Sequence, residues 1–183
     1  MLRVILLSLL LLAALFLGLR VCAPSPEQVE DRRLLAELNR EEGRAYREAN
    51  RRQPGVMTLQ NGLQLELLRL GTGPVPTPED WVQVHYRGSH LDGRGFQDSY
   101  RETTPATVAI AQTIPAWRQA LVELPVGSRA RLVVPPDLAY GLAGGGPIGP
   151  AETLLFELEL LAIVEPPSTP EPDPSQAPVP GLR

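Results

Sequence analysis

The segment 153–164 alternates between apolar and acidic residues near its centre. Phe156, Leu158 and Leu160 are separated by two glutamates. Successive side chains of a β-strand point to opposite faces, so this alternation predicts a strand with one buried and one solvent-facing side. Phe156 is expected on the buried side, because it shares a face with the two leucines.

Further strand signals precede this segment and surround one short helix. The remaining strands are predicted over residues 56–60, 63–67, 81–86, 107–110 and 129–134. Asn61-Gly62 is a two-residue hairpin signal that joins the first two of them. Residues 115–124 carry apolar side chains, Trp117 among them, at helical spacing. One short helix on an antiparallel sheet is an α+β arrangement, and about 110 residues suffice for its single core.

A longer helix is predicted before the sheet. Ser25 is a suitable cap, Pro26 suits the first helical position, and Gln28 completes a capping box. The helix is expected to end near Arg52, and its arginines are interleaved with acidic residues, as in a solvated helix with surface ion pairs. Its apolar stripe is narrow and Gly43 weakens its middle, so we expect a stalk, in a monomer or a weak dimer.

The two end segments of the sequence differ in composition from this central part. Arg3 precedes an apolar run over 4–19, which is typical of a secretory signal or a short membrane anchor. Cys22 stands where a bacterial lipoprotein would be lipidated, although its neighbours fit such a site poorly, and Pro24 disfavours ordinary cleavage. We therefore expect tethering to the membrane, in the cell envelope or periplasm, with full release as the alternative. Seven prolines in 166–183 predict a disordered tail.

Composition argues against several classes of function. The formal net charge is −4 and no basic patch offsets it, which argues against a nucleic-acid partner. The single cysteine permits no internal disulfide and no thiolate metal site. The two histidines, His85 and His90, lie on either side of a glycine in a strand-and-turn context that is unfavourable for joint ligation. No metal site is therefore expected.

Aromatic residues are scarce, and most of them lie within a few short motifs. The chain has three Phe, four Tyr and two Trp. Five of these nine lie, in order, within Val-His-Tyr-Arg-Gly, Asp-Gly-x-x-Phe, Ile-Pro-Ala-Trp, Pro-Pro-Asp-Leu-Ala-Tyr-Gly and Thr-Leu-Leu-Phe. Their placement in strands and at element ends indicates one apolar pocket. Taken in this order, the motifs resemble those of the FKBP-type peptidyl-prolyl cis–trans isomerases, and the likeness covers about residues 54–165.

The resemblance implies a fold and an activity. The fold would be an antiparallel, strongly curved sheet wrapped on one short helix, and the activity would be isomerisation of X–Pro bonds in proline-containing polypeptides, without a cofactor. Exported bacterial (Mip-like) members with a shortened N-terminal helical region are the nearest likeness. The expected division is a signal or membrane anchor over 1–23, a helical stalk over 24–53, the isomerase domain over 54–165 and a Pro-rich tail over 166–183.

The resemblance also assigns site residues. The catalytic positions would be Tyr86, Phe96, Trp117, Tyr140 and Phe156, and the substrate-binding positions Gln97, Asp98, Thr113, Ile114 and Ile148. Trp117 would be the floor for the proline ring, with three other aromatic rings as walls. The Ile114 N–H would hold a substrate carbonyl, and the Tyr140 hydroxyl would contact the substrate backbone at the rim. Ile148, on the Gly-Pro-rich loop, would cover one side.

Two positions depart from the family pattern. Members usually carry Asp directly after the pocket Phe, where this chain has Gln97, and a one-residue bulge is one way to bring Asp98 into that role. Otherwise the neutral amide of Gln97 must accept the hydrogen bonds. Ala106 replaces a bulky apolar residue, which predicts a more open pocket. The competing function, favoured by Gln97, is a tethered chaperone or binding module that grips proline-containing chains with little turnover.

Overall fold

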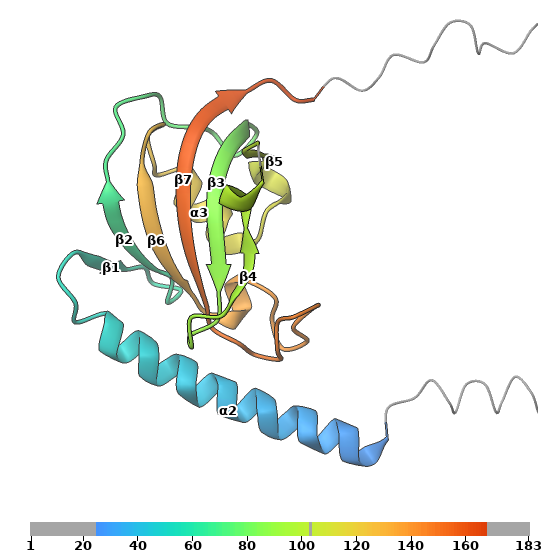
Figure 1. Ribbon diagram of the computed structural model, residues 1–183. Helices are drawn as coiled ribbons and strands as arrows, with labels where there is room; N and C mark the ends of the chain where they lie inside the picture. Colours follow the sequence, from blue (N-terminus) through green and yellow to red (C-terminus); the bar gives the residue numbers. More distant parts are fainter. Residues whose placement is uncertain (1–24, 103, 168–183) are drawn as a thin grey trace, which may run out of the picture.

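The computed structural model describes residues 25–102 and 104–167, which form a curved sheet, a helix against its inner face and a long N-terminal helix (Figure 1). The expected anchor with Cys22 lies outside these residues, as does all but the first two positions of the expected tail. Within the described part, none of the helices combines the length and the apolar character that crossing a bilayer requires.

Seven strands form one antiparallel sheet in the order β1-β2-β6-β7-β3-β4, and β5 also pairs with β3. The strands are β1 (Val56–Thr58), β2 (Gln64–Arg69), β3 (Trp81–Ser89), β4 (Gly95–Asp98), β5 (Ala106–Ala109), β6 (Arg129–Val134) and β7 (Leu154–Val164). The helices are α2 (Pro26–Asn50) and α3 (Pro115–Leu121), with 3₁₀ turns η1 (Ser99–Arg101), η2 (Ile110–Gln112) and η3 (Pro136–Leu138). The α+β prediction is therefore confirmed, although β4 had no predicted counterpart.

The core lies between the concave face of the sheet and α3. Phe156, Leu158 and Leu160 of β7 are buried there, whereas the glutamates between them lie on the convex face, as the alternation predicts. Helix α3 buries Trp117 and Leu121 against the same layer. The edge strands and this helix leave a hollow beside α3, which holds the candidate site.

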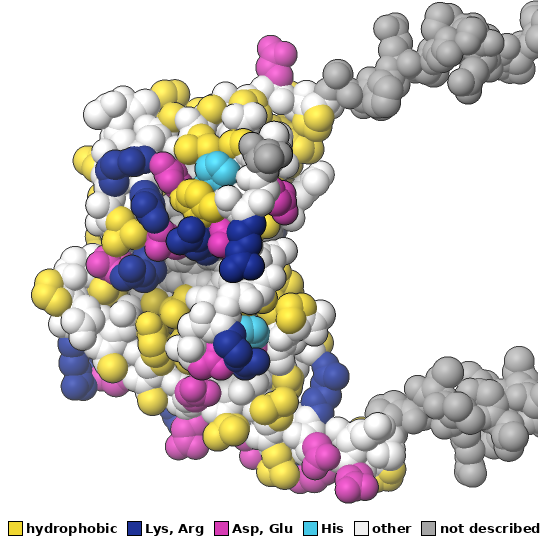
Figure 2. Space-filling view, in the orientation of Figure 1, with side chains coloured by type: hydrophobic (Ala, Val, Ile, Leu, Met, Phe, Trp, Pro, Cys, Tyr) yellow, Lys and Arg dark blue, Asp and Glu magenta, His cyan; other side chains and the backbone are white. Residues whose placement is uncertain are grey.

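The convex face carries a network of ion pairs (Figure 2). Arg69 Nη2 lies 2.7 Å from Glu159 Oε1, and the Tyr100 hydroxyl donates to Glu159 Oε2 at 2.8 Å. Burial alone would raise the pKa of Glu159, but these two hydrogen bonds hold it below its usual value. Burial and the hydrogen bond to Glu159 together raise the pKa of Tyr100 to about 12. This face is a solvated, charge-paired surface.

The turn between β1 and β2 differs from the two-residue hairpin expected at Asn61-Gly62. The Leu59 N–H donates to Leu63 O at 2.8 Å, and the Gly62 N–H donates to Leu59 O, so three residues form the loop. Gly62 has a φ of +84°, whereas Asn61 is not in the positive-φ region. A two-residue type I′ turn needs positive φ at both central positions, and here only the glycine has it. The hairpin is therefore right and its loop length is wrong.

Helix α2 begins with the predicted capping box and ends at Asn50, slightly before the expected Arg52. Ser25 Oγ accepts from the Gln28 N–H at 3.2 Å, and Gln28 Oε1 accepts from the Ser25 N–H at 2.9 Å. The C-terminal half of the helix also contacts the domain. Gly43 is buried, and the side chain of Thr153 fills the space that a Cβ at this position would occupy. The glycine thus serves close packing, which the sequence pattern did not indicate.

Three amide hydrogen bonds accompany this packing. Asn39 Nδ2 donates to the Pro150 carbonyl at 2.8 Å, at the N-terminal side of the contact. Gln64 of β2 accepts from Asn50 Nδ2 at 2.8 Å and donates to the Arg47 carbonyl at 2.7 Å. Gln64 is therefore only 2 % exposed, although it lies between two leucines in the predicted strand 63–67, where alternation predicts a solvent-facing side chain. The helix covers that position.

Candidate functional site

A pocket of about 420 Å³ opens between β3, β5 and the start of α3. Its lining consists of Trp81, Tyr86, Gln97, Thr107, Val108, Ala109, Gln112, Thr113, Ile114, Trp117, Tyr140 and Phe156. Every one of these side chains is uncharged in neutral water. The pocket brings together seven of the ten predicted site residues that lie in the described part of the chain, and the other three, Phe96, Asp98 and Ile148, do not line it.

Trp117 lies at the centre of the pocket because α3 begins two residues before it. Pro115 occupies the first position of the helix and Ile114 is its N-cap, which turns the third residue of the helix toward the sheet. The indole is 6 % exposed, and its Nε1–H is buried without a hydrogen-bond partner in the described structure. A buried donor without a partner is rare in proteins, so the indole N–H is an unusual feature of this pocket.

Two aromatic rings meet the indole edge to face. The Tyr86 ring centroid lies 4.9 Å away at an interplanar angle of 78°, and that of Phe156 lies 5.6 Å away at 85°. Tyr86 comes from the middle of β3, whereas Phe156 comes from the neighbouring β7. The walls of the pocket therefore depend on the alignment of these two central strands with α3.

Phe96 is separated from the pocket by the ring of Phe156. Its centroid is 5.7 Å from that of Phe156, and its ring covers Gly88, where an added Cβ would come within 2.5 Å of it. Phe96 lines a second, larger hollow on the other side of Phe156 and does not line the pocket itself. Gly88 is thus the residue that allows two rings to pack over β3 at this point.

The rim of the pocket offers a ligand one backbone N–H group and one side-chain hydroxyl group. The Ile114 N–H makes no hydrogen bond to any other described residue, so it is available to a carbonyl oxygen. Thr113 Oγ1 donates to the Ile110 carbonyl at 2.8 Å and thereby stiffens the turn before α3. Tyr140 is 36 % exposed and is held by a tight turn in which Gly141 has a φ of +65°. Its hydroxyl can therefore reach a ligand that lies in the pocket.

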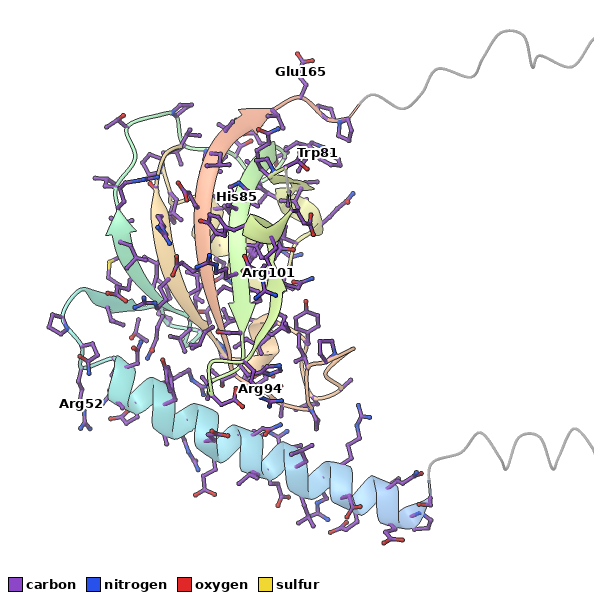
Figure 3. The ribbon with its side chains drawn as sticks, in the orientation of Figure 1. Arg52, Trp81, His85, Arg94, Arg101 and Glu165 are labelled. Carbon is purple, nitrogen blue, oxygen red and sulfur yellow. The ribbon has the colours of Figure 1, made fainter. Side chains whose placement is uncertain are left out.

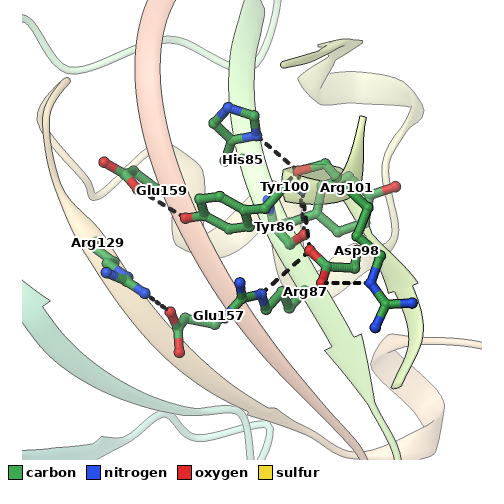
Figure 4. Close-up of polar contacts among 10 residues, drawn as sticks. His85, Tyr86, Arg87, Asp98, Tyr100, Arg101, Arg129, Glu157 and Glu159 are labelled. Carbon is green, nitrogen blue, oxygen red and sulfur yellow. Dashed lines mark hydrogen bonds and ion pairs between the residues drawn. The ribbon is translucent and has the colours of Figure 1, made fainter. Parts of the chain in front are cut away.

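Gln97 and Asp98 lie on opposite faces of β4. Gln97 pairs with Gly88 and lines the pocket, whereas Asp98 pairs with Arg87. On the convex face Asp98 lies 3.3 Å from Arg87 Nε and 3.5 Å from Arg101 Nε, and it accepts from the Tyr100 N–H at 3.1 Å (Figure 4). A bulge does occur in this strand pair, but it precedes Gln97 and leaves Asp98 outside the pocket.

Ile148 lies deeper than its expected place over the pocket. It is 7 % exposed, bridges to Gly145 within the loop after η3, and belongs to the core cluster. Its side chain does not line the pocket. Ile148 therefore anchors the loop that carries Tyr140 to the hydrophobic core.

Part of the lining was not predicted. The pocket continues along β5 past Thr107, Val108 and Ala109 as far as Trp81, at the start of β3. Ala106 predicts a more open pocket, but a single substitution does not predict the direction in which the pocket extends. The only available signal was Trp81 itself, an aromatic residue at the edge of a predicted strand.

Electrostatics keep the pocket neutral. Burial, with smaller contributions from the nearby Glu102 and Tyr140, raises the pKa of Tyr86 above its ordinary value. Tyr86 therefore remains a neutral phenol well beyond physiological pH. The arrangement can hold an apolar ring, accept or donate a few hydrogen bonds and exclude water, and its lining supplies no acid or base that titrates near neutrality.

Comparison with known families matches residues 73–161 to FKBP-type peptidyl-prolyl cis-trans isomerase. The chain is 43 % identical over 129 residues to the outer membrane protein MIP of Legionella longbeachae, covering 70 % of this chain and 55 % of that protein. It is 42 % identical over 126 residues to the peptidyl-prolyl cis-trans isomerase Mip of Coxiella burnetii, covering 68 % and 55 %. The chain thus spans about half the length of the curated relatives it matches.

Solved structures agree with the sequence comparison. The crystal structure of FkpA from Escherichia coli superimposes with a TM-score of 0.71 at 30 % identity, covering 85 % of this chain and 81 % of that one. A peptidyl-prolyl cis-trans isomerase from Pseudomonas syringae gives a TM-score of 0.65 at 35 % identity and covers 71 % and 96 %. These matches confirm the family expected from the motifs: the chain belongs to the FKBP-type peptidyl-prolyl cis–trans isomerases and is of the Mip-like kind.

Proposed function

We propose that this chain accelerates the cis–trans isomerisation of X–Pro bonds in the pocket floored by Trp117. The observation that carries the proposal is the neutral, aromatic pocket around a buried indole whose N–H has no partner among the described residues. Such a pocket fits a proline ring, which is compact and apolar and carries no N–H of its own. The family membership supports the same activity.

The chemistry requires no nucleophile. Rotation about the peptide bond has a barrier of about 18–20 kcal/mol, because the amide loses its resonance when it is twisted. The planar amide is more dipolar than the twisted one and is better solvated by water. A pocket that excludes water therefore favours the twisted amide relative to the planar one, which is catalysis by differential binding.

The proposed roles follow from the positions of the residues. Trp117 supports the proline ring, and Tyr86 and Phe156 enclose it. The free Ile114 N–H binds the carbonyl on one side of the proline, while the Tyr140 hydroxyl binds the substrate backbone at the rim.

Three further predicted residues have indirect roles. Phe96 holds Phe156 in place from behind, and Thr113 keeps the turn at the pocket edge rigid. Gln97 offers a neutral amide at the pocket edge. Asp98 and Ile148 remain outside the proposed substrate contacts, because neither lines the pocket.

The proposed substrates are exposed X–Pro segments of proteins outside the inner membrane. Support comes from the apolar run over 4–19 and from the relatives, one of which is named an outer membrane protein. In this proposal the N-terminal segment tethers the chain to the membrane, through the apolar run or through lipidation of Cys22. Helix α2 then connects the tether to the isomerase domain. A monomer or a weak dimer is the proposed assembly.

A protease-free isomerisation assay on a short Leu-Pro peptide tests the activity. We expect the chain to accelerate exchange at catalytic concentration, and the Trp117→Ala variant to lose at least about tenfold in kcat/KM, since one aromatic contact of about 1.4 kcal/mol corresponds to that factor. Trp117→Phe retains an apolar ring and should fall between the two. Tyr46→Ala, which removes an aromatic side chain on α2, is the matched control and should leave the rate unchanged.

The circular dichroism spectra of all variants establish that they are folded. A wild-type rate no higher than that of Trp117→Ala would overturn the isomerase proposal. If the peptide still bound to the pocket, that result would support a binding module with little turnover instead.

A further inference from the structure

The end of the sheet next to the pocket is also the place where the Pro-rich segment leaves the fold. Val164, the last residue of β7, is the Cα partner of Trp81, and Trp81 lines the pocket. On its other side Trp81 pairs with Ala109, which lines the pocket too. Figure 3 shows Trp81 and Glu165 at the same end of the molecule. Residues beyond 164 therefore begin one strand away from the pocket lining.

The opening along β5 leads in the same direction. The lining extends from Trp117 past Val108 and Ala109 to Trp81, and we call this row of residues the groove. Trp81 is the Cα partner of the last residue of β7. The groove includes residues of β3 and β5 beyond the indole on which the proline ring is proposed to lie. It offers space for the residues that flank a proline in an extended chain.

The charges of the groove and of the segment select one stretch of the sequence. The lining is uncharged, and burying a carboxylate there without a partner would be costly. Pro172 follows Glu171 and Pro174 follows Asp173, so these two X–Pro pairs fit poorly. Residues 177–180, Ala-Pro-Val-Pro, carry no charge and place a small apolar residue before each proline.

Chain length also favours this stretch. Residues 165–176 form a twelve-residue connection that includes five prolines, and a Pro-rich chain of this length can span up to about 37 Å at about 3.1 Å per residue. Five steps along β3, from Trp81 to Tyr86, span about 17 Å, which sets the distance from the exit of β7 to the inner end of the groove. The connection is therefore long enough for the stretch to reach the groove, and tethering makes its binding an intramolecular step.

We propose that residues 177–180 of this chain bind in its own prolyl pocket and compete with external substrates. The inference deepens the proposed function, on which it rests, because it names an occupant of the same site. At an effective concentration equal to its dissociation constant the tethered stretch occupies half of the pockets. The apparent affinity for an external peptide is then reduced about twofold.

The two tryptophans of the chain provide a direct measurement. Trp81 and Trp117 are its only tryptophans and both line the pocket, so the two indole N–H signals in a ¹H–¹⁵N NMR spectrum report on this site alone. The full chain is compared with the variant Pro178→Ala/Pro180→Ala in the same detergent. We expect at least one indole signal to differ between them.

Two further NMR measurements complete this test. The matched control Pro172→Ala/Pro174→Ala should keep the wild-type signals, because these prolines follow charged residues. A blocked Ala-Pro-Val-Pro peptide should move the signals of Pro178→Ala/Pro180→Ala toward those of the wild type. Coincident indole signals in the wild type and in Pro178→Ala/Pro180→Ala overturn the inference. Signals that change on tenfold dilution of the wild type also overturn it, since they indicate exchange between copies.

Activity gives an independent readout. Pro178→Ala/Pro180→Ala should show a kcat/KM toward a dilute Leu-Pro peptide about twofold above the wild type, while the matched control stays at the wild-type value. If none of the three proteins accelerates isomerisation, the proposed function fails, whereas the indole comparison still decides whether the stretch binds. The two failures are therefore distinguishable.

Discussion

Replacing Gly43 by alanine tests the contact between α2 and the domain. A Cβ at this position would lie 2.1 Å from Thr153 Oγ1 and 2.8 Å from Thr153 Cβ, well inside van der Waals contact. Thr153 cannot yield easily, because it is 1 % exposed and its hydroxyl accepts from Arg47 Nη1 at 2.6 Å. Overpacking of this kind costs about 1–3 kcal/mol, and loss of the hydrogen bond adds about 1 kcal/mol.

Helix propensity acts in the opposite direction. Alanine in the middle of a free helix is about 1 kcal/mol more favourable than glycine. The net expectation for Gly43→Ala is therefore a loss of about 1–3 kcal/mol in the free energy of unfolding. Urea unfolding measures this loss, and hydrogen exchange of the α2 amides should show that the helix opens more often.

The sign of the change in the free energy of unfolding decides whether Gly43 packs on Thr153. Ala45→Gly, at an exposed position of the same helix, is the control and should cost about 1 kcal/mol through propensity alone. If Gly43→Ala instead stabilised the protein by a similar amount, α2 would be a free helix, and the packing on Thr153 would be refuted.

Two other substitutions test the two faces of the sheet. The pKa of Glu159 is lowered in the fold, so its contribution is present above the unfolded value of about 4.3 and is lost as the pH falls through the folded value. Glu159→Gln should thus cost about 1–2 kcal/mol at pH 7 and less at pH 3 by urea unfolding, and an equal cost at both pH values would contradict this pairing. On the concave side, Gly88→Ala would place a Cβ 2.5 Å from the Phe96 ring and 3.0 Å from Phe156. It should lower the free energy of unfolding by about 1–3 kcal/mol and reduce kcat/KM through displacement of Phe156, so an unchanged rate and stability would count against the packing described.

Much of the sheet and the aromatic part of the site could be predicted from the sequence, because both depend on local pattern. Alternation over 153–164 places Phe156 inward, and helical spacing after Pro115 turns Trp117 toward the sheet. Both signals arise within a few neighbouring residues. They are therefore readable without knowledge of the tertiary contacts.

The errors arise where a distant segment decides the outcome. Gln64 is buried because α2 covers it, and Gly43 marks a close approach to Thr153, and neither contact follows from local periodicity. The side of β4 on which Asp98 lies depends on where the bulge falls in its pairing with β3. The groove toward Trp81 likewise results from the pairing of β5, β3 and β7.

The pH dependence of the catalysed rate tests most directly whether the pocket acts by excluding water. All of the lining side chains are neutral over the ordinary range, and the pKa of Tyr86 is raised further from it. With a blocked Leu-Pro peptide that has no ionisable group, kcat/KM should stay constant within about twofold between pH 6 and pH 9. A bell-shaped or sigmoidal profile in that range would show that an acid or a base takes part, and it would contradict the account.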